Sequence, residues 1–355
     1  GNAVIEKLIK SPLISNIKLI SVVSEDINLN DDIDVMWGIF TRFDPGFDMY
    51  FSNKKFTDAI PVYEGVAGID ATWKGGYQKT LEMDLAILNN IAIKAALAAG
   101  KVIQKYMNEN VLVEKKKGGA SYASQVVTTV DIECEIAILT HLLPTCDEFN
   151  LALLSEETED NGSRFQKDYF WCIDPMDGTL AFINKYPGFS VSIALVAKDG
   201  TPHIGVVFDP SRNILYHAIK GIGVYKNSVP WKIKQSNDHL TYVTDRKLKN
   251  TSRAAEIEIL LNDNINKMSL NSFKEISGAG AVLNAIFVLE NGPACMLKFP
   301  KKERGGGSIW DYAATACIYQ ELGLPSTNFK GKRLDLNKKN GAFMNQEGVY
   351  FSNLI

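Results

Sequence analysis

The strongest constraint on the fold lies at residues 169–182, where a short apolar run meets two carboxylates. The run Tyr169–Ile173 has the aromatic and β-branched content of a buried strand, and it leads directly into Asp-Pro-Met-Asp-Gly-Thr. Asp174 would then leave the carboxyl end of the strand, the edge at which open α/β sheets bind ligands. Asp174, Asp177 and the Met176 carbonyl offer the hard oxygen ligands that divalent cations prefer. The segment therefore predicts an α/β fold with a metal site at a strand end.

The next two residues, Gly178 and Thr179, add an anion site to this prediction. If they open a helix, their amides direct a partial positive charge at a phosphate. The competing interpretation is an ordinary type I turn, because Asp-Pro and Asp-Gly are common turn dipeptides. The rest of the chain decides between the two.

Size and composition narrow the class of protein. With 355 residues, the chain has room for two domains or for one large domain with an appendage. Its net charge of −3 gives no case for a nucleic-acid polymer or an anionic membrane as a partner. No apolar run approaches the roughly 18 residues of a membrane span. The five cysteines are scattered and odd in number, which favours reduced thiols and a cytoplasmic location.

The pattern along the chain indicates a linker followed by a larger domain. The mixed polar run at 74–84 contains Gly75-Gly76 and is typical of a linker. Apolar residues then recur at three- and four-residue steps over 85–106, which predicts an amphipathic helix. Periodicity and turn residues predict further elements: a helix over 132–143, strands over 151–154, 190–196, 204–208 and 295–299, and a helix after 310 that Gly323 ends.

Three acidic motifs lie in this larger part, each where a strand ends or a helix begins. They are Ser155-Glu156-Glu157, the Asp-Pro-Met-Asp-Gly-Thr segment and Trp310-Asp311. Together with Val127–Asp131 and Gly278–Ala281, they make residues 84–355 resemble the inositol monophosphatase superfamily, which includes bisphosphate nucleotidases and fructose-bisphosphatase relatives. The resemblance implies an α/β fold with the layered α-β-α-β-α architecture of the sugar phosphatases for 84–355.

The resemblance also implies a metal ligand set. One Mg²⁺ would be held by Glu156, Asp174 and the Met176 carbonyl, and a second by Asp174, Asp177 and Asp311. Asp174 would be shared between the two ions, and a third ion is possible. Two cations about 4 Å apart neutralise a phosphate ester, lower the pKa of a bound water and stabilise the leaving oxygen. This chemistry requires no Ser, Cys or His nucleophile, because water attacks directly.

Catalytic roles follow from the same resemblance for Asp131 and Thr179, which would orient the attacking water, and for Glu156. The residues also allow simpler interpretations. Glu156 and Asp311 could be carboxylates at helix starts, and Asp131 and Thr179 could be helix caps. The order of the three motifs favours metal binding for Glu156 and Asp311, whereas both interpretations stay open for Asp131.

The substrate prediction depends on a basic segment that precedes Asp311. Lys298, Lys301, Lys302 and Arg304 put four positive charges within seven residues. Such a segment could hold a second phosphate, which favours a 3'(2'),5'-bisphosphate nucleotide as the substrate, or it could be a solvated loop. Inositol monophosphate and fructose 1,6-bisphosphate are the alternative substrates.

Substrate binding is assigned to Gly178, Thr179, Gly278, Ala279 and Lys298. One departure from the resemblance bears on this assignment. In many relatives the residues after Trp-Asp are small, whereas Tyr follows Asp here. This tyrosine either narrows the site or points away from it.

Residues 1–79 do not share this resemblance. Their motifs Ser-Glu-Asp-Ile, Met-Trp-Gly-Ile-Phe-Thr-Arg-Phe-Asp-Pro and Gly-Ile-Asp-Ala-Thr resemble the C-terminal segment of UbiD-type decarboxylases. A strand over 17–23 and a helix from Asp31 that ends at 42–45 are predicted. We expect a small α/β appendage that assembles a homodimer or higher oligomer, since so short a segment buries little core alone. A non-catalytic, decarboxylase-associated assembly subunit is the alternative function from another class.

Overall fold

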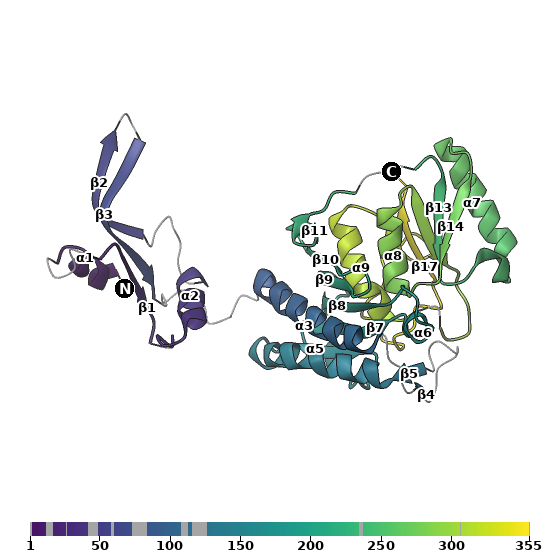
Figure 1. The fold of residues 1–355 in the computed structure, drawn as a ribbon, viewed down its shortest axis with the longest axis horizontal. Coiled ribbons are helices and arrows are strands. Elements are labelled where there is room, and N and C mark those ends of the chain that lie inside the picture. The colour runs from purple at the N-terminus through teal and green to yellow at the C-terminus, as the bar shows by residue number, and fades with distance from the viewer. Residues whose placement is uncertain are drawn as a thin grey trace. The chain divides into compact units, whose positions relative to one another are not determined.

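The computed structural model forms two compact units, Gly1–Glu82 and Met83–Ile355 (Figure 1). The described residues are 2–11, 17–25, 27–41, 49–57, 60–72, 84–107, 113–115, 126–233, 237–305 and 307–354. The predicted linker falls at the boundary between the units, and all of it except Asp84 lies outside the described residues. Each unit is described by itself below.

The first unit is a small mixed sheet with two helices. Its elements are α1 (Asn2–Leu8), β1 (Leu19–Val23), α2 (Asp32–Thr41), β2 (Met49–Thr57) and β3 (Ile60–Ala71). The central strand β3 pairs in parallel with β1 and antiparallel with β2. The predicted strand is confirmed by β1. The predicted helix start is confirmed as well, because the Asp31 carboxylate accepts from the amides of Ile33 and Asp34. The predicted helix end at 42–45 lies outside the described residues.

The second unit has five layers that alternate helices and sheets, and this confirms the predicted α-β-α-β-α architecture (Figure 1). One face of a seven-stranded sheet is covered by α3 and α5, and the other face by α9. With α8, α9 forms the middle helical layer, and α8 packs on a five-stranded sheet whose other side carries α7. The helices are α3 (Leu85–Tyr106), α5 (Thr129–Glu148), α6 (Thr179–Ile183), α7 (Ala254–Met268), α8 (Ala281–Glu290) and α9 (Ile309–Glu321).

The two sheets differ in strand direction. The first has the order β12-β11-β10-β9-β8-β7-β6, in which β6 and β7 run parallel and the other neighbours antiparallel. The second has the order β14-β13-β15-β17-β16, in which β13 runs parallel to both β14 and β15. Their strands are β6 (Ala152–Ser155), β7 (Tyr169–Asp177), β8 (Ser190–Ala197), β9 (Pro202–Asp209), β10 (Ile214–Ile219), β11 (Gly223–Lys226), β12 (Val229–Pro230), β13 (Leu240–Thr244), β14 (Phe273–Ser277), β15 (Ala294–Lys298), β16 (Ser326–Thr327) and β17 (Val349–Asn353). A two-stranded ladder, β4 (Val113–Lys115) with β5 (Val126–Thr128), precedes α5.

Helix α3 has the bounds that the sequence predicts. Asp84 caps it by accepting from the amides of Ala86 and Ile87, and its apolar stripe is buried in the core under the first sheet. By length and composition alone α3 could cross a membrane. The burial of its stripe against the sheet shows that it is a core helix of this unit.

Helix α5 is longer than predicted at both ends. It begins at Thr129 rather than Ile132 and continues through Pro144 to Glu148. The prediction followed the apolar periodicity, which does not mark the first turn because Thr129 and Asp131 there are polar. The earlier start places Asp131 in that first turn, where it is buried.

Strand β7 also exceeds its prediction, with a consequence for the site. It continues past Ile173 to Asp177 and contains a bulge, since Asp174 pairs with Ser192 and Asp177 with Ser190. Pro175, which has no amide to donate to the ladder, lies in this bulge. In a regular strand, residues three apart face opposite sides of the sheet. The extra residue therefore lets both carboxylates face the same side.

Candidate metal centre

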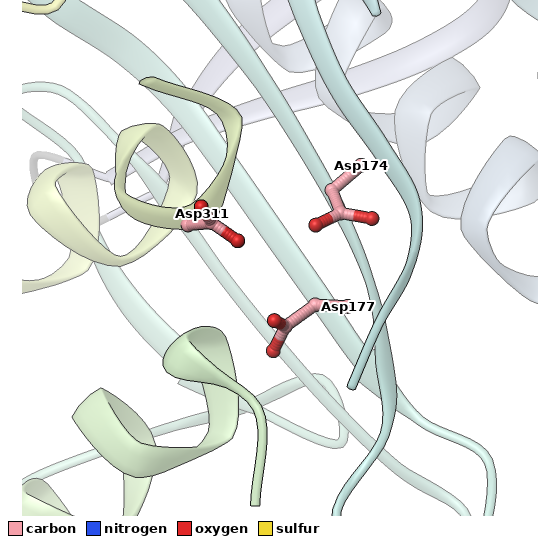
Figure 2. Close-up of side chains that lie close together, drawn as sticks. All are labelled: Asp174, Asp177 and Asp311. Atoms are coloured by element: carbon pink, nitrogen blue, oxygen red, sulfur yellow. The ribbon is translucent and has the colours of Figure 1, made fainter. Parts of the chain in front are cut away.

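Three aspartates from distant parts of the chain come together at the end of β7. Asp174, Asp177 and Asp311 each offer a carboxylate oxygen, and these atoms lie within 4.8 Å of one another. Figure 2 shows two of the side chains extending from the strand toward the third, which comes from the first turn of α9. We call these three residues the acidic triad.

Asp177 connects β7 to the start of α8. Its two carboxylate oxygens accept from the amides of Ala281 and Val282, at 3.0 and 2.9 Å. Gly280 is required beside them, because a Cβ there would lie 2.3 Å from Asp177 Oδ2. A carboxylate oxygen has two lone pairs, so both oxygens keep capacity for a cation. The side chain thus serves the helix terminus and the triad together.

Asp311 is held by its own helix and by β8. It forms a capping box with Ser308, whose amide donates to Asp311 Oδ2. One residue earlier, the Trp310 carbonyl accepts from Ser192 Oγ at 3.2 Å. Since Ser192 pairs with Asp174, this hydrogen bond fixes the first turn of α9 beside the β7 bulge. The helix-start interpretation of Asp311 is correct, and it is compatible with membership of the triad.

The triad concentrates negative charge in a poorly solvated place. Burial, together with the charge of Asp311, raises the pKa of Asp177 well above the usual carboxyl range. Burial and the charge of Glu156 raise the pKa of Asp311. Buried carboxylates of like charge are costly unless a cation is present, and hard carboxylate oxygens suit Mg²⁺. The donor set therefore fits a divalent cation of this kind.

Glu156 lies beside the triad without being one of the three converging groups. It follows β6 directly, and its amide donates to the Ile173 carbonyl at 3.2 Å. Ser155 pairs with Ile173, so Glu156 comes next to Asp174 across the parallel strands. It lies at a bend after a strand, so its interpretation as a helix-start carboxylate is wrong. Its role as a metal ligand stays a prediction.

Thr179 links two other predicted site residues. Its hydroxyl lies 3.1 Å from Asp131 Oδ1 and 3.2 Å from the Met176 carbonyl oxygen. Gly178, with φ of 87°, is the cap of the short helix α6, so Thr179 is the first helical residue rather than the cap. Asp131 therefore contacts the end of β7 near Met176 through Thr179. This contact connects α5 to the end of β7.

Glycines allow three chain segments to meet behind the triad. A Cβ on Gly178 would lie 2.4 Å from the Gly188 carbonyl oxygen, and a Cβ on Gly188 would lie 2.9 Å from Ala279 Cα. Gly278 and Ala279 form the turn that leads into α8, and the Gly278 amide donates to the Thr244 carbonyl at 3.3 Å. Both predicted substrate-binding residues are thus next to Asp177 and its helix.

Lys298, the predicted substrate-binding cation, lies near the triad. Its ammonium is 3.6 Å from Asp245 Oδ2. Its positive charge acts to lower the pKa of Asp177 and of Asp311, against the effect of burial. Tyr312, whose orientation was left open, is fully buried, and its ring packs in the core cluster of the unit. It therefore belongs to the core instead of narrowing the site.

Sequence reasoning missed the supporting residues of the site. Ser190 and Ser192 lie opposite Asp177 and Asp174 on β8, and Asp245 pairs with Lys298. The only signal for the serines was that small residues alternate with apolar ones along β8. No motif marks Asp245, because its place depends on the pairing of β13 with β15.

The comparisons with known proteins agree with this geometry. Residues 84–352 match the inositol monophosphatase family, whose members are Mg²⁺-dependent phosphatases, and residues 1–71 match the C-terminal domain of 3-octaprenyl-4-hydroxybenzoate carboxy-lyase. Among curated relatives, the Nus factor SuhB of Pasteurella multocida (strain Pm70) is 37% identical over 152 residues, which are 42% of this chain and 53% of that protein. The Nus factor SuhB of Xylella fastidiosa (strain Temecula1) is 29% identical over 245 residues, 68% of this chain and 82% of that protein. The chain thus spans about half the length of the first of these relatives.

Solved structures share the fold of the larger unit. CysQ from Bacteroides thetaiotaomicron, a bacterial member of the inositol monophosphatase family, is 26% identical with a TM-score of 0.59, covering 76% of this chain and 98% of that one. The extragenic suppressor protein suhB from Bartonella henselae is 23% identical with a TM-score of 0.57, covering 76% of this chain and 94% of that one. Through its match over residues 84–352, the chain belongs to the inositol monophosphatase family.

Proposed function

We propose that this chain is a Mg²⁺-dependent phosphomonoesterase that hydrolyses small phosphate esters with water as the nucleophile. The observation that carries the proposal is the acidic triad, whose carboxylate oxygens converge within 4.8 Å. Family membership over residues 84–352 supports it. The three side chains of the triad are all carboxylates, which suit a bound cation and direct attack by water.

Metal binding would involve two overlapping ligand sets. Glu156, Asp174 and the Met176 carbonyl would hold one Mg²⁺, while Asp174, Asp177 and Asp311 would hold the second. When bound, the ions supply charge neutralisation of the ester and a lowered pKa for the attacking water. The capping box of Asp311 and the helix contacts of Asp177 keep these carboxylates in fixed orientations before any ion arrives.

The protein's own residues would manage the water and its proton. The Thr179 hydroxyl lies within hydrogen-bonding distance of both Asp131 and the Met176 carbonyl, so its oxygen has a defined direction in which to accept from water. The buried Asp131 carboxylate can take the proton that this water loses as it attacks phosphorus. Gly178 and Gly278, both at positive φ, form turns near Asp177, and the phosphate would bind beside these turns.

A 3'(2'),5'-bisphosphate nucleotide is the substrate we favour. Lys301, Lys302 and Arg304 are exposed on the segment that joins β15 to α9, close to Asp311 in sequence, where they could hold a second phosphate. A structural neighbour of this fold, inositol monophosphatase II from Staphylococcus aureus, has been solved with 2'AMP and with inositol monophosphate. Those ligands belong to that protein, and they indicate which esters to test here.

Phosphate release from a panel of esters tests the proposal. With Mg²⁺, we expect the protein to hydrolyse adenosine 3',5'-bisphosphate faster than inositol 1-phosphate or fructose 1,6-bisphosphate. Asp174→Asn should lose most of this activity, whereas Asp263→Asn, an exposed change on α7, serves as the matched control. No release from any ester with Mg²⁺ would refute the phosphatase proposal. Faster release from inositol 1-phosphate would refute only the choice of substrate.

For the first unit we propose an assembly role, supported by its match to a decarboxylase C-terminal domain and by its exposed apolar side chains. Leu29 and Ile33 are 71% and 81% exposed. In this role the first unit would make the chain a homodimer or higher oligomer. We also propose a cytoplasmic location and no nucleic-acid partner. Light scattering should show a smaller particle for a Leu29→Glu, Ile33→Glu variant, and an unchanged mass would count against this role.

Because relatives are named Nus factors, RNA binding should be measured directly.

A further inference from the structure

A cavity of about 610 Å³ lies between the sides of the two sheets of the larger unit. The first sheet contributes Lys226 of β11 and the residues that follow β12, and the second contributes Ile276 of its edge strand β14. The C-terminal half of α8 forms a further wall, which ends at Glu290. The first turn of α8, which holds Asp177, lies about 13 Å away along the helix axis. The cavity is therefore at the opposite end of α8 from the acidic triad.

Positive charge exceeds negative charge in the lining of this cavity. Glu290 accepts from Arg212 Nη1 at 2.8 Å and from Lys226 Nζ at 2.6 Å. Arg212 Nε also donates to the buried Asp209 carboxylate at 2.6 Å. Lys232, which is exposed, is the third cation of the lining. Three cations against two carboxylates leave one positive charge in excess among the described residues.

The two paired cations keep donors for a ligand. A guanidinium has five N–H groups and an ammonium has three. Within the described part of the chain, Arg212 uses three of its donors, two on carboxylates and one on the Tyr216 hydroxyl. Lys226 uses one, on Glu290. An oxyanion in the cavity can accept from those that remain, and such charge-assisted hydrogen bonds are strong. The shared carboxylate meanwhile holds both cations in place.

Aromatic side chains lie next to these cations. Trp231 and Phe287 are half-buried and line the cavity. Lys226 Nζ is 5.6 Å from the centre of the Trp231 ring, and the guanidinium carbon of Arg212 is 4.9 Å from the centre of the Phe287 ring. An anion bound to the cations would therefore have ring faces beside it, against which a flat apolar group can pack. The cavity thus offers matched places for a negative charge and for a ring.

We infer that this cavity binds an organic acid that joins one carboxylate to a flat aromatic ring. The carboxylate takes the remaining donors of Arg212 and Lys226, and the ring packs against Trp231. A single negative charge equals the excess charge of the lining, whereas a phosphate dianion would exceed it. The volume lies within the range of about 300–1,000 Å³ that is typical of small-molecule sites. The inference goes beyond the proposed hydrolysis, in which this cavity takes no part.

Three small molecules separate the contributions of charge and ring. Indole-3-acetate has both, indole-3-acetamide lacks the charge, and acetate lacks the ring. Titration calorimetry on the full chain should give a Kd of about 1 mM or tighter for indole-3-acetate, from the binding energy per atom of drug-sized ligands. The other two should bind at least about 10-fold more weakly. EDTA in the buffer removes divalent cations, so the carboxylate cannot bind through an ion at the triad.

Variants then assign the binding to this cavity. Lys226→Gln and Lys232→Gln should each weaken binding of indole-3-acetate by about 5-fold. Trp231→Leu should weaken it by about 3-fold or more, since the ring face is lost. Glu290→Gln should instead tighten it by about 3-fold or more, because the excess positive charge grows. Lys267→Gln, an exposed change on α7, is the matched control and should keep the wild-type Kd.

Each outcome bears on the inference alone, because binding is measured without turnover. No binding of indole-3-acetate well above the expected Kd, or equal affinity for the acid and its amide, would overturn it. A wild-type Kd in both Lys226→Gln and Lys232→Gln would place the ligand elsewhere, as would weaker binding by Glu290→Gln. Circular dichroism melting shows which variants are folded. Lys232→Gln, at an exposed position, keeps the test decisive if Trp231→Leu does not fold.

Discussion

Gly280 offers the sharpest test of how the site is built. Its φ of −65° and ψ of 171° suit any residue, so Gly280→Ala changes sterics without straining the backbone. The new Cβ would lie 2.3 Å from Asp177 Oδ2 and 2.5 Å from Oδ1. Ordinary contact begins near 3.4 Å, so the carboxylate must withdraw by about 1 Å. It would then lose one or both of its hydrogen bonds to the start of α8.

The expected size of the effect follows from those bonds. Hydrogen bonds to a charged group contribute about 1.5–3 kcal/mol each, and the lower flexibility of Ala in the unfolded chain returns about 0.5–1 kcal/mol. A net loss of about 2 kcal/mol should lower the melting temperature by about 4–8 °C. A displacement of about 1 Å at a metal ligand should lower kcat/KM by about 100-fold.

A double-mutant cycle checks the reasoning. The free energy of unfolding, measured in urea, should fall by about 2 kcal/mol on Gly280→Ala in the wild type but by less than about 0.5 kcal/mol in an Asp177→Ala background, where the clash is absent. Calorimetry of Mg²⁺ binding should show weaker affinity in the single variant. An equal cost in both backgrounds would show that the change acts elsewhere, and the proposed contact between Gly280 and Asp177 would be refuted.

Three further predictions concern other parts of the larger unit. Thr179→Val should lower kcat by about 100-fold with little change in KM, because Asp131 loses its link to the attacking water; steady-state kinetics measures this. Without Mg²⁺, the free energy of unfolding should fall as the pH rises from about 4 toward neutrality, since the folded triad binds protons that the unfolded chain has released. Melting in EDTA across this range should show the slope, and saturating Mg²⁺ should reduce it. Glu290→Gln should lower the free energy of unfolding by about 1–2 kcal/mol, because Arg212 and Lys226, each one-third exposed, lose their shared carboxylate partner. Urea unfolding measures this, and an unchanged midpoint concentration of urea would count against that network.

The elements and the acidic residues could be predicted because their signals are local. The apolar periodicity over 85–106 defines α3 fully, since a helix repeats its buried face in the sequence itself. The predicted site residues converge because Asp177 ends β7, Asp174 lies at the bulge just before that end, and Asp311 lies in the first turn of α9. The resemblance to a known family supplied their order.

What could not be predicted depends on contacts between distant segments. The β7 bulge that turns both aspartates to one side follows from pairing with β8, and no residue of β7 alone specifies it. The use of Asp177 as a partner for α8 requires a helix that begins more than a hundred residues later. The burial of Tyr312 depends on Gly307 at a positive φ, because a Cβ there would lie 2.3 Å from the Tyr312 hydroxyl oxygen, and the sequence does not show this approach.

The contact between Asp177 and α8 bears on how an inactive form of the protein should be made. A common choice is to replace any one metal ligand and to regard the product as the intact protein without turnover. Here Asp177 also fastens a strand of the first sheet to a helix of the middle layer, so its removal would loosen the packing between layers. A cell carrying such a variant would lose protein as well as chemistry, and the two losses could not be separated. Asp174, whose Oδ1 accepts from the amide of Met176 within the same strand, is a second position at which to make that variant.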